Sequence, residues 1–269
     1  MTPKRFNALV WAHAKAAGRH TLPWRATTDP YRILVSEVML QQTQVERVIP
    51  YYERFLERFP NVADLAKAPL SDVLVLWQGL GYNRRAKMLH EAARAVMEDF
   101  NGRMPETVED LETLPGVGHY TARAVAAFSS NQDVIFIETN IRTAIIHAFF
   151  PEEESVNDRE VITILEKSFP NGRAREWYSA LMDYGASLKR EGVRANRKSA
   201  GYTKQTKFEG SGRQARGIIL RALLSGPKKE SSLLKLLETG RASQLKDALT
   251  ALHAEGLVER ARGTYQLPR

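Results

Sequence analysis

The chain has 269 residues, a formal net charge of +8 at pH 7 and 43% hydrophobic residues, so it is long enough to form one large or several small buried cores. No apolar run is long enough to cross a bilayer, and the N-terminus MTPKRFNALVWAHA lacks the pattern of a secretory signal, so we expect a cytoplasmic protein with no membrane partner. Cysteine is absent, which excludes disulfides, thiolate chemistry and cysteine-ligated metals within this chain.

Hydrophobic periodicity predicts that the first two thirds of the chain are all helical. The sequence VIFI at 134–137 is apolar and β-branched, but no pairing partner lies nearby, so we expect a short extended lead-in to the next helix rather than a strand. Pro50 is expected to start a new helix. The other expected helices, each ended by a proline, glycine or polar break, span residues 1–20, 31–55, 61–67, 71–78, 84–100, 140–149, 158–168 and 174–189.

The stretch LPGVGHYT, residues 114–121, predicts a helix, a tight hairpin and a second helix. Gly116 and Gly118 flank Val117 and lack a Cβ where the backbone must turn. A helix N-terminus that follows glycines presents unpaired N–H groups, and a phosphate is the usual ligand for them. On the glycines alone, an ordinary corner between two helices without a ligand is equally compatible.

The regular pattern stops at residues 191–211, which are polar, basic and glycine-bearing and predict a loop or linker. Residues 189–206 carry a net charge of +5 and residues 207–269 a net charge of +6, so the basic surplus belongs to the C-terminal third. This distribution is expected if that third holds DNA, and a solvated lysine-rich surface is the alternative.

The last sixty residues predict a separate small unit. Helical patterns at 213–224, 231–238 and 244–255 are followed by LVERARGTYQL, which alternates around Gly263 as a small hairpin would. Three helices with a two-stranded wing resemble a winged helix-turn-helix, in which residues 241–253 would be the recognition helix. A protein-docking module is the alternative.

Six motifs occur in one order along the chain: LPWR, SEVMLQQTQV, GLGY, the glycine hairpin, ETNIR and MDYGA. Together they resemble the helix-hairpin-helix (HhH-GPD) DNA glycosylase superfamily, and most closely its MutY-type adenine glycosylases, over roughly residues 20–188. The resemblance implies an all-α, two-lobed helix-hairpin-helix core, and the pattern of the last sixty residues adds a small winged-helix-like α+β domain that does not resemble the C-terminal domain of MutY-type enzymes. The predicted domains are a terminal helical lobe of residues 1–28 plus 134–190, a six-helix lobe of residues 29–133, a basic linker of residues 191–211 and a winged-helix-like domain of residues 212–269.

The absence of cysteine is a departure from this family. Its members usually follow the stretch that resembles MDYGA with four cysteines that hold an iron–sulfur cluster, and Lys189 stands about where the first would be. No cluster of that kind can form in this chain, and we expect no cofactor. In this family, the backbone carbonyls of the hairpin, here around Leu114 and Val117, would coordinate a potassium or sodium ion.

Excision of a base needs an acid that protonates the departing base and a negative group near the oxocarbenium-like sugar. Glu37 lies in the apolar run SEVML, where burial would raise its pKa and keep its proton near neutral pH. Periodicity alone would make Glu37 a surface residue. The resemblance favours the catalytic acid, because the family's catalytic glutamate falls on Glu37.

Glu138 is the candidate for the second carboxylate. The family has aspartate here, followed by glycine where this chain has Thr139. The longer side chain indicates a rebuilt site, weak activity or a purely electrostatic role, and a helix-capping carboxylate is the structural alternative. Tyr120 occupies the position of the Schiff-base lysine of bifunctional members, so we expect hydrolysis by water without AP-lyase activity. Asn140 would align the water or the second carboxylate.

The resemblance also implies a pocket for a base flipped out of the duplex. Trp24 offers a stacking face, with a plain core residue as the alternative. Asp183 offers an acceptor for the exocyclic amine that adenine has and thymine lacks. Arg25 and Leu40 complete the predicted pocket.

Further residues are implied to contact DNA. Gln42 and Tyr82 match residues that enter the base stack where the flipped base was. The basic composition of the linker suggests that Arg197 and Lys198 follow phosphates, and a plain flexible linker is the equal alternative. The remaining predicted DNA contacts are Asn83, Arg84, Gly116, Val117, Gly118 and His119.

The sequence therefore predicts a monomeric, monofunctional DNA glycosylase that removes a mispaired base from double-stranded DNA, with adenine opposite 8-oxoguanine or guanine as the leading substrate. One alternative is the removal of thymine, uracil or a damaged pyrimidine from a mispair with guanine. The other is a non-catalytic DNA-binding protein on the same scaffold. Glu138 and Thr139 favour that alternative, whereas Glu37, Tyr120 and Asn140 argue against it.

Overall fold

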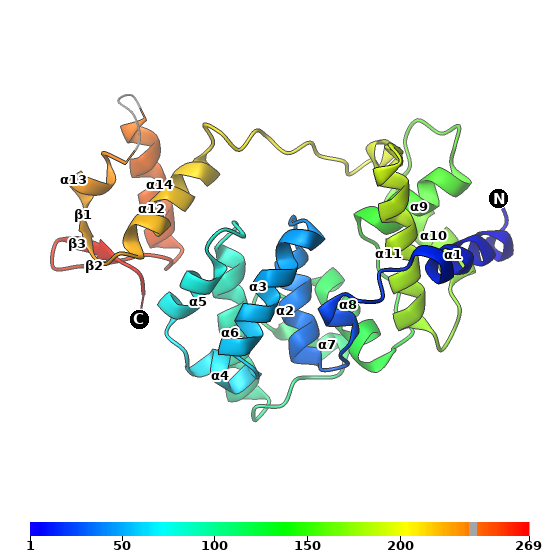
Figure 1. Cartoon of the computed structure of the whole chain (residues 1–269), viewed down its shortest axis with the longest axis horizontal. Coiled ribbons are helices and arrows are strands. Elements are labelled where there is room, and N and C mark those ends of the chain that lie inside the picture. Colours follow the sequence, from blue (N-terminus) through cyan, green and yellow to red (C-terminus); the bar gives the residue numbers. More distant parts are fainter. Residues whose placement is uncertain (237–240, 269) are drawn as a thin grey trace. The chain divides into compact units, whose positions relative to one another are not determined.

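The computed structural model describes residues 1–236 and 241–268, and most of them are helical (Figure 1). Contacts divide the chain into two units. The first contains Met1–Glu37, Pro105–Thr113 and Val117–Lys204, and the second contains Val38–Met104, Leu114–Gly116 and Gln205–Arg269. The two units have other boundaries than the domains predicted from the sequence, and those domains stay a prediction.

The first unit is built around aromatic residues of its first and last long helices. Phe6 packs edge to face against Trp177, with ring centroids 6.3 Å apart, and both side chains are fully buried. Thr2 caps the first helix and Asn157 forms a capping box with Glu160 at the start of another, so local sequence signals set both helix starts. The helices of this unit are α1 (Pro3–Ala17), η1 (Pro23–Arg25), most of α2 (Pro30–Leu40), α7 (Val108–Thr113), α8 (His119–Ser130), α9 (Thr139–Phe149), α10 (Asp158–Ser168), α11 (Ala174–Arg190) and η2 (Ala195–Lys198).

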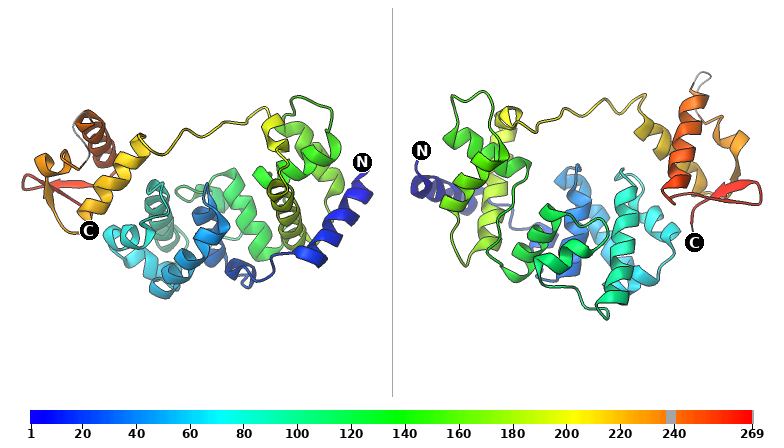
Figure 2. Two further views of the ribbon diagram at one scale, coloured as in Figure 1. Left: turned by 45° about the horizontal axis from the view of Figure 1, so that its top comes forward. Right: turned by 180° about the vertical axis from the view of Figure 1, so that it is seen from behind.

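Helices α9 and α11 lie side by side in both views of the ribbon (Figures 1 and 2). Gly185 is the reason that they can approach closely. A Cβ added to Gly185 would lie 2.0 Å from the main-chain oxygen of Asn140 and 2.6 Å from its carbonyl carbon. The glycine of the MDYGA motif therefore lets α11 contact the backbone of α9 directly.

The apolar segment 134–137 is extended but pairs with no strand of the described residues, which confirms the expected lead-in to a helix. Its backbone groups are satisfied by one side chain instead. The hydroxyl of Tyr178 accepts from the N–H of Phe136 at 3.2 Å and donates to the carbonyl of Val134 at 2.8 Å. A buried tyrosine thus replaces a neighbouring strand.

In the second unit, Pro50 lies inside α3 (Val45–Arg58), so the expected helix start at this proline is wrong. The break comes earlier, just after α2. The guanidinium of Arg85 donates to the carbonyls of Val38, Met39 and Gln41 at 2.6 to 3.0 Å and so satisfies the end of α2. The remaining helices of this part of the chain are α4 (Val62–Lys67), α5 (Leu70–Trp77) and α6 (Arg84–Asp99).

The C-terminal residues form the predicted winged-helix-like arrangement, with its strands drawn as arrows in Figure 2. The expected hairpin is confirmed, and Arg262 and Gly263 at its turn both have positive φ, as a two-residue turn of type I′ requires. A third strand joins it in the antiparallel order β1-β3-β2. The helix expected at 231–238 is shorter, because α13 ends at Leu233 and residues 237–238 lie outside the described part. The elements are α12 (Gly212–Leu223), β1 (Lys228–Lys229), α13 (Glu230–Leu233), α14 (Ala242–Ala254), β2 (Glu259–Ala261) and β3 (Thr264–Gln266).

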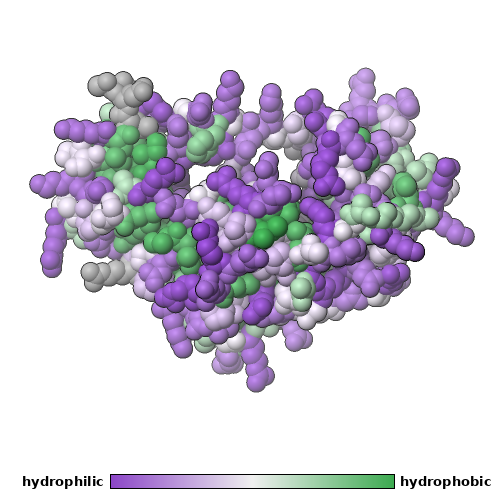
Figure 3. Space-filling model, viewed as in Figure 1, coloured by the Kyte–Doolittle hydropathy of each residue, from purple (hydrophilic) through white to green (hydrophobic). Residues whose placement is uncertain are grey.

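The described residues contain no helix that is both long and apolar enough to span a bilayer. Hydrophilic residues cover most of the face shown in Figure 3, and hydrophobic residues gather over smaller areas. The all-α core with a small C-terminal α+β unit is the fold class predicted from the sequence.

The contact at Gly185 predicts an effect on stability. Gly185→Ala should lower the free energy of unfolding by about 3 kcal/mol, because the new methyl group would overlap the Asn140 carbonyl and force the helices apart. Urea denaturation followed by circular dichroism measures this change. Gly201→Ala is the matched control, since a Cβ there meets no atom within 4 Å, and its effect should stay within about 0.5 kcal/mol. Equal effects of the two substitutions would contradict the close approach.

Candidate active site

Glu37 lies on α2 in a run of buried apolar residues. The carboxylate of Asp29 accepts from the N–H of Tyr31 at 2.9 Å and so helps to start this helix. The Glu37 side chain is only 6% exposed. Burial raises its pKa from 4.5 to about 7, a hydrogen bond from Tyr120 partly opposes this rise, and the charge of Glu138 adds to it. Glu37 can therefore hold a proton at neutral pH.

Tyr120 reaches Glu37 from the second position of α8. Its hydroxyl donates to Oε2 of Glu37 at 2.9 Å, and its ring packs edge to face on Phe136 with centroids 5.5 Å apart. Burial, together with the charges of Glu37 and Glu138, raises the pKa of the Tyr120 phenol well above its usual value. Tyr120 is therefore a neutral donor that orients the Glu37 carboxyl group.

Glu138 is the residue that precedes α9, and its carboxylate folds back over the start of that helix. Oε1 accepts from the N–H groups of Asn140 at 2.7 Å and Ile141 at 2.9 Å, and Oε2 accepts from the Asn140 side-chain amide at 3.2 Å. Burial raises the pKa of Glu138 above its usual value, and the backbone hydrogen bonds and the charges of Lys189 and Arg142 oppose this rise only in part. The carboxylate of Glu138 therefore caps its own helix, as the shorter aspartate commonly does, and this is the structural alternative noted above.

The two carboxyl groups differ in what surrounds them. The Glu37 carboxyl group is buried and accepts a hydrogen bond from a phenol, whereas the Glu138 carboxylate accepts from the N-terminus of α9 and lies near two cations. Burial raises the pKa of both groups, but only Glu138 has neighbouring cations and backbone N–H groups that stabilise its anion. The structure therefore brings together four of the predicted catalytic residues, from α2, α8 and the start of α9: Glu37, Tyr120, Glu138 and Asn140.

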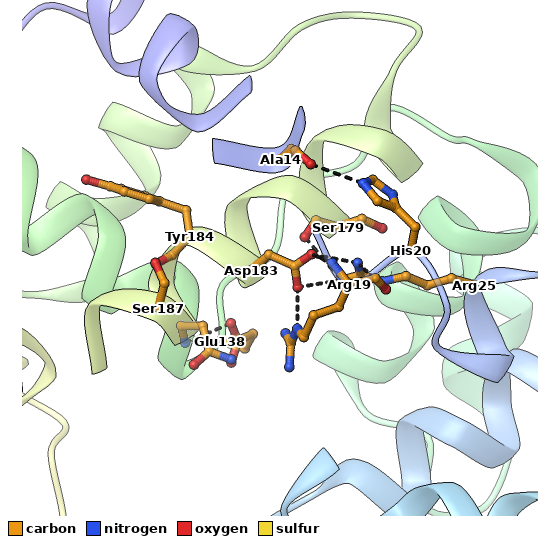
Figure 4. A network of polar contacts seen from close by, with 10 residues as sticks. Ala14, Arg19, His20, Arg25, Glu138, Ser179, Asp183, Tyr184 and Ser187 are labelled. Carbon is orange, nitrogen blue, oxygen red and sulfur yellow. Dashed lines mark hydrogen bonds and ion pairs between the residues drawn. The ribbon is translucent and has the colours of Figure 1, made fainter. Parts of the chain in front are cut away.

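Arg25 and Asp183 of the predicted base pocket also come together, in a buried ion-pair network (Figure 4). Asp183 projects from α11 and is 3% exposed. Arg25 donates to its two oxygens at 2.7 and 2.9 Å, and Arg19 donates its backbone N–H at 2.8 Å and its Nε at 2.6 Å. Burial raises the pKa of Asp183, but the hydrogen bonds and charges of Arg25 and Arg19 outweigh it and hold the pKa below its usual value.

These four hydrogen bonds use the acceptor positions that a carboxylate offers. Asp183 can accept from the amine of a base only if an arginine group releases it, so its predicted role in base recognition stays a prediction. Arg19 lies outside every motif, so the sequence did not indicate that it binds Asp183. Trp24, between the two arginines in sequence, is half-buried.

The predicted hairpin residues are divided between the two units. In the first, Gly118 precedes α8 and provides no side-chain cap for the start of this helix. In the second, Gly116 has a φ of +75°, and a Cβ there would lie 2.5 Å from Cβ of Met88. The monovalent cation at the carbonyls of Leu114 and Val117 stays a prediction. No group of three or more His, Asp or Glu side chains among residues 1–236 and 241–268 could hold a metal ion.

Two predicted DNA-stack residues, Gln42 and Tyr82, share an unusual backbone conformation in the second unit. Their φ values are +55° and +48°, which few residues other than glycine adopt and which often marks functional loops. The Tyr82 ring is 37% exposed and lies 5.6 Å from the Arg85 guanidinium. Their DNA contacts stay predictions, as do those of Asn83 and Arg84 at the start of α6.

The other predicted residues lie apart from these groups. Leu40 is half-buried at the end of α2 and belongs to the second unit, so its place in the base pocket stays a prediction. His119 is exposed at the start of α8, and Arg197 is exposed in η2. The Lys198 ammonium donates to the carbonyl of Pro151 at 2.6 Å, which already occupies one of its donors.

The family described as HhH-GPD superfamily base excision DNA repair protein matches residues 35–171, which include the four residues of the Glu37 site. The chain belongs to this superfamily. The sequence resemblance to it is thereby confirmed.

Several relatives carry the name adenine DNA glycosylase. The one from Mycolicibacterium smegmatis is 35% identical over 270 residues, which cover 93% of this chain and 92% of the relative. The one from Buchnera aphidicola subsp. Baizongia pistaciae is 37% identical over 184 residues, and the match spans about half of that protein, 51%, and 67% of this chain. Among solved structures, a thermostable thymine-DNA glycosylase is similar with a TM-score of 0.64 and 29% identity over 73% of this chain and 94% of that one.

The Asp183 network predicts a large effect on stability. Asp183→Ala should lower the free energy of unfolding by about 3 to 5 kcal/mol, because it leaves the partly buried charges of Arg19 and Arg25 without their counter-ion. Urea denaturation measures the change. Asp158→Ala is the control, since Asp158 also pairs with an arginine but is half exposed, and it should cost about 1 kcal/mol or less. A loss for Asp183→Ala no larger than the control would contradict the buried network.

Proposed function

We propose that this chain is a monofunctional adenine DNA glycosylase of base excision repair. It hydrolyses the N-glycosidic bond of an adenine mispaired with 8-oxoguanine or guanine in double-stranded DNA. The observation that carries the proposal is the buried Glu37 carboxyl group, whose pKa is about 7 and which Tyr120 orients beside Glu138. Membership of the superfamily and the names of the relatives support the substrate.

Glu37 acts as the general acid. Adenine is a poor leaving group as an anion, and a proton placed on one of its ring nitrogens lets it depart neutral. Glu37 is suited to this step because a large share of it is protonated at neutral pH. Tyr120 holds the carboxyl group in one orientation through its 2.9 Å hydrogen bond.

Glu138 stabilises the positive charge that develops on the sugar as the bond breaks. Its hydrogen bonds to the start of α9 fix the carboxylate in place and favour its ionised form. Water then completes the hydrolysis and leaves an abasic site. Tyr120 cannot form a Schiff base with the sugar, so the proposal includes no AP-lyase activity.

The uncapped start of α8 suits a DNA phosphate. The enzyme acts as a cytoplasmic monomer on mismatched duplex DNA and needs no cofactor, apart from the monovalent cation expected at the hairpin. A pyrimidine substrate is less favoured, because the relatives that match nearly the whole chain are named for adenine. A non-catalytic role is also less favoured, because it does not explain why a carboxyl group with a pKa of about 7 is buried at this position.

Glu37→Gln should lower the single-turnover excision rate by about 1000-fold, because the amide cannot supply the proton. The assay uses end-labelled duplexes containing A·8-oxoG, A·G, T·G, U·G and matched pairs, with and without hot alkali. Breaks at adenine that need alkali support a monofunctional adenine glycosylase. Duplex binding by the variant should be nearly unchanged.

Glu166→Gln is the control, since it removes the same charge from an exposed position on α10. It should excise at the wild-type rate. Breaks only at a pyrimidine would refute the proposed substrate, and turnover by Glu37→Gln at the rate of Glu166→Gln would remove Glu37 from the mechanism.

The pH dependence of excision provides a second test. The rate should fall as the pH rises above about 7, because Glu37 then loses the proton that it must donate. The hydrogen bond from Tyr120 lowers the pKa of Glu37, so Tyr120→Phe should move this alkaline limb to higher pH. Single-turnover rates between pH 5 and 9 measure the shift. An unmoved alkaline limb would show that Tyr120 does not act on the acid.

A further inference from the structure

Lys189, in the last turn of α11, contacts the candidate active site although no motif includes it. Its ammonium donates to Oδ1 of Asn140 at 2.9 Å. The side-chain amide of Asn140 in turn donates from Nδ2 to Oε2 of Glu138 at 3.2 Å. The three residues form a chain of hydrogen bonds that runs from the exposed end of α11 to the Glu138 carboxylate.

The direction of these hydrogen bonds is set at both ends, by Lys189 and by Glu138. An asparagine amide has one acceptor oxygen and one donor nitrogen, whereas an ammonium group can only donate and an ionised carboxylate can only accept. Turning the amide around would place two donors face to face at Lys189 and two acceptors face to face at Glu138. Lys189 therefore reinforces the orientation in which Asn140 donates to Glu138.

The backbone contact between α11 and α9 explains how Lys189 reaches this position. Gly185 contacts the main chain of Asn140, and Lys189 lies four residues, about one helical turn, further along α11. The two positions therefore share one face of the helix. Gly185 in one turn of α11 contacts the backbone of Asn140, and Lys189 in the next turn hydrogen-bonds its side chain.

Four charged or titratable groups act on Glu138 from the surrounding elements. Glu37 on α2 and Tyr120 on α8 interact with it electrostatically, and Arg142 on α9 and Lys189 on α11 both lower its pKa. The guanidinium of Arg142 is already engaged by Asp158, with two hydrogen bonds of 2.7 Å. Lys189 instead donates to the neutral side-chain amide of Asn140, and this partner does not neutralise the positive charge of the ammonium group.

We propose that Lys189 is a positioning residue for base excision, which orients Asn140 toward Glu138 and supplies the positive charge that favours the Glu138 anion. This role rests on the proposed function of the Glu37 and Glu138 site. It is distinct from a contact with DNA, because Lys189 acts through Asn140 on another protein group.

The test compares Lys189→Met, Lys189→Arg and Arg190→Met with the full-length wild-type chain. Lys189→Met removes the donor and the charge, Lys189→Arg keeps both, and Arg190→Met removes one positive charge from the next, exposed residue. Single-turnover rates on a saturating A·8-oxoG duplex are measured between pH 5 and 9. Thermal unfolding and duplex affinity are measured in parallel.

Lys189→Met should excise about tenfold more slowly at pH 7. A decrease of this size is expected when the hydrogen bond from the charged Lys189 ammonium to Asn140 is lost. Its acidic limb should move to higher pH, because Glu138 then needs a higher pH to become an anion. Lys189→Arg should recover most of the rate, and Arg190→Met should stay within about twofold of wild type. A rate and pH profile of Lys189→Met that match Arg190→Met would overturn the proposal.

A weaker duplex affinity of Lys189→Met with an unchanged rate at saturation would also overturn it, since Lys189 would then be a phosphate contact. A direct titration separates the proposal from the proposed function. The carboxyl carbon of Glu138, assigned by its loss in Glu138→Gln, is followed by ¹³C NMR in free protein. A higher pKa in Lys189→Met than in Arg190→Met is expected even if the wild type cleaves no duplex. Equal pKa values would refute the role of Lys189.

Discussion

The contact between Gly185 and the main chain of Asn140 is the constraint on which the candidate active site depends. With a Cβ at residue 185, α11 would have to move away from α9, because the added atom would lie 2.0 Å from the Asn140 oxygen. Asp183 and Lys189 project from the same helix and reach different partners, the arginines near the N-terminus and the Asn140 side chain. One small residue thereby lets α11 lie close enough to α9 for Lys189 to reach the Asn140 side chain.

The electrostatic character of the site follows from the different surroundings of its two carboxyl groups, Glu37 and Glu138. Glu37 loses its contact with water and receives a single phenolic hydrogen bond, so its protonated form is favoured. Glu138 is also removed from much of its water, but two backbone N–H groups and a side-chain amide replace it. The substitution of glutamate for the family's aspartate is compatible with this arrangement, because the longer chain can curl back onto the helix that follows it.

Much of the site could be predicted because it lies within motifs. Glu37 and Tyr120 are 83 residues apart in sequence, and only the resemblance to a known family indicated that they act together before the structure placed them in contact. Arg19 and Lys189 could not be predicted in the same way. Arg19 lies just after α1 and Lys189 lies in the last turn of α11. The partner of each residue depends on how helices distant in sequence pack together, which local periodicity does not encode. The helix start predicted at Pro50 is wrong because α3 already begins at Val45 and continues through this proline.

The network at Asp183 also has a consequence for the order in which the protein can fold during synthesis. Arg19 and Asp183 are 164 residues apart in sequence, so α1 leaves the ribosome long before the helix that completes its core exists. At about 5 to 20 residues per second, this interval lasts roughly 10 to 30 s. For that time the apolar side of α1, including Phe6 and Val10, has no native partner on α11 and is a natural surface for a chaperone to shield.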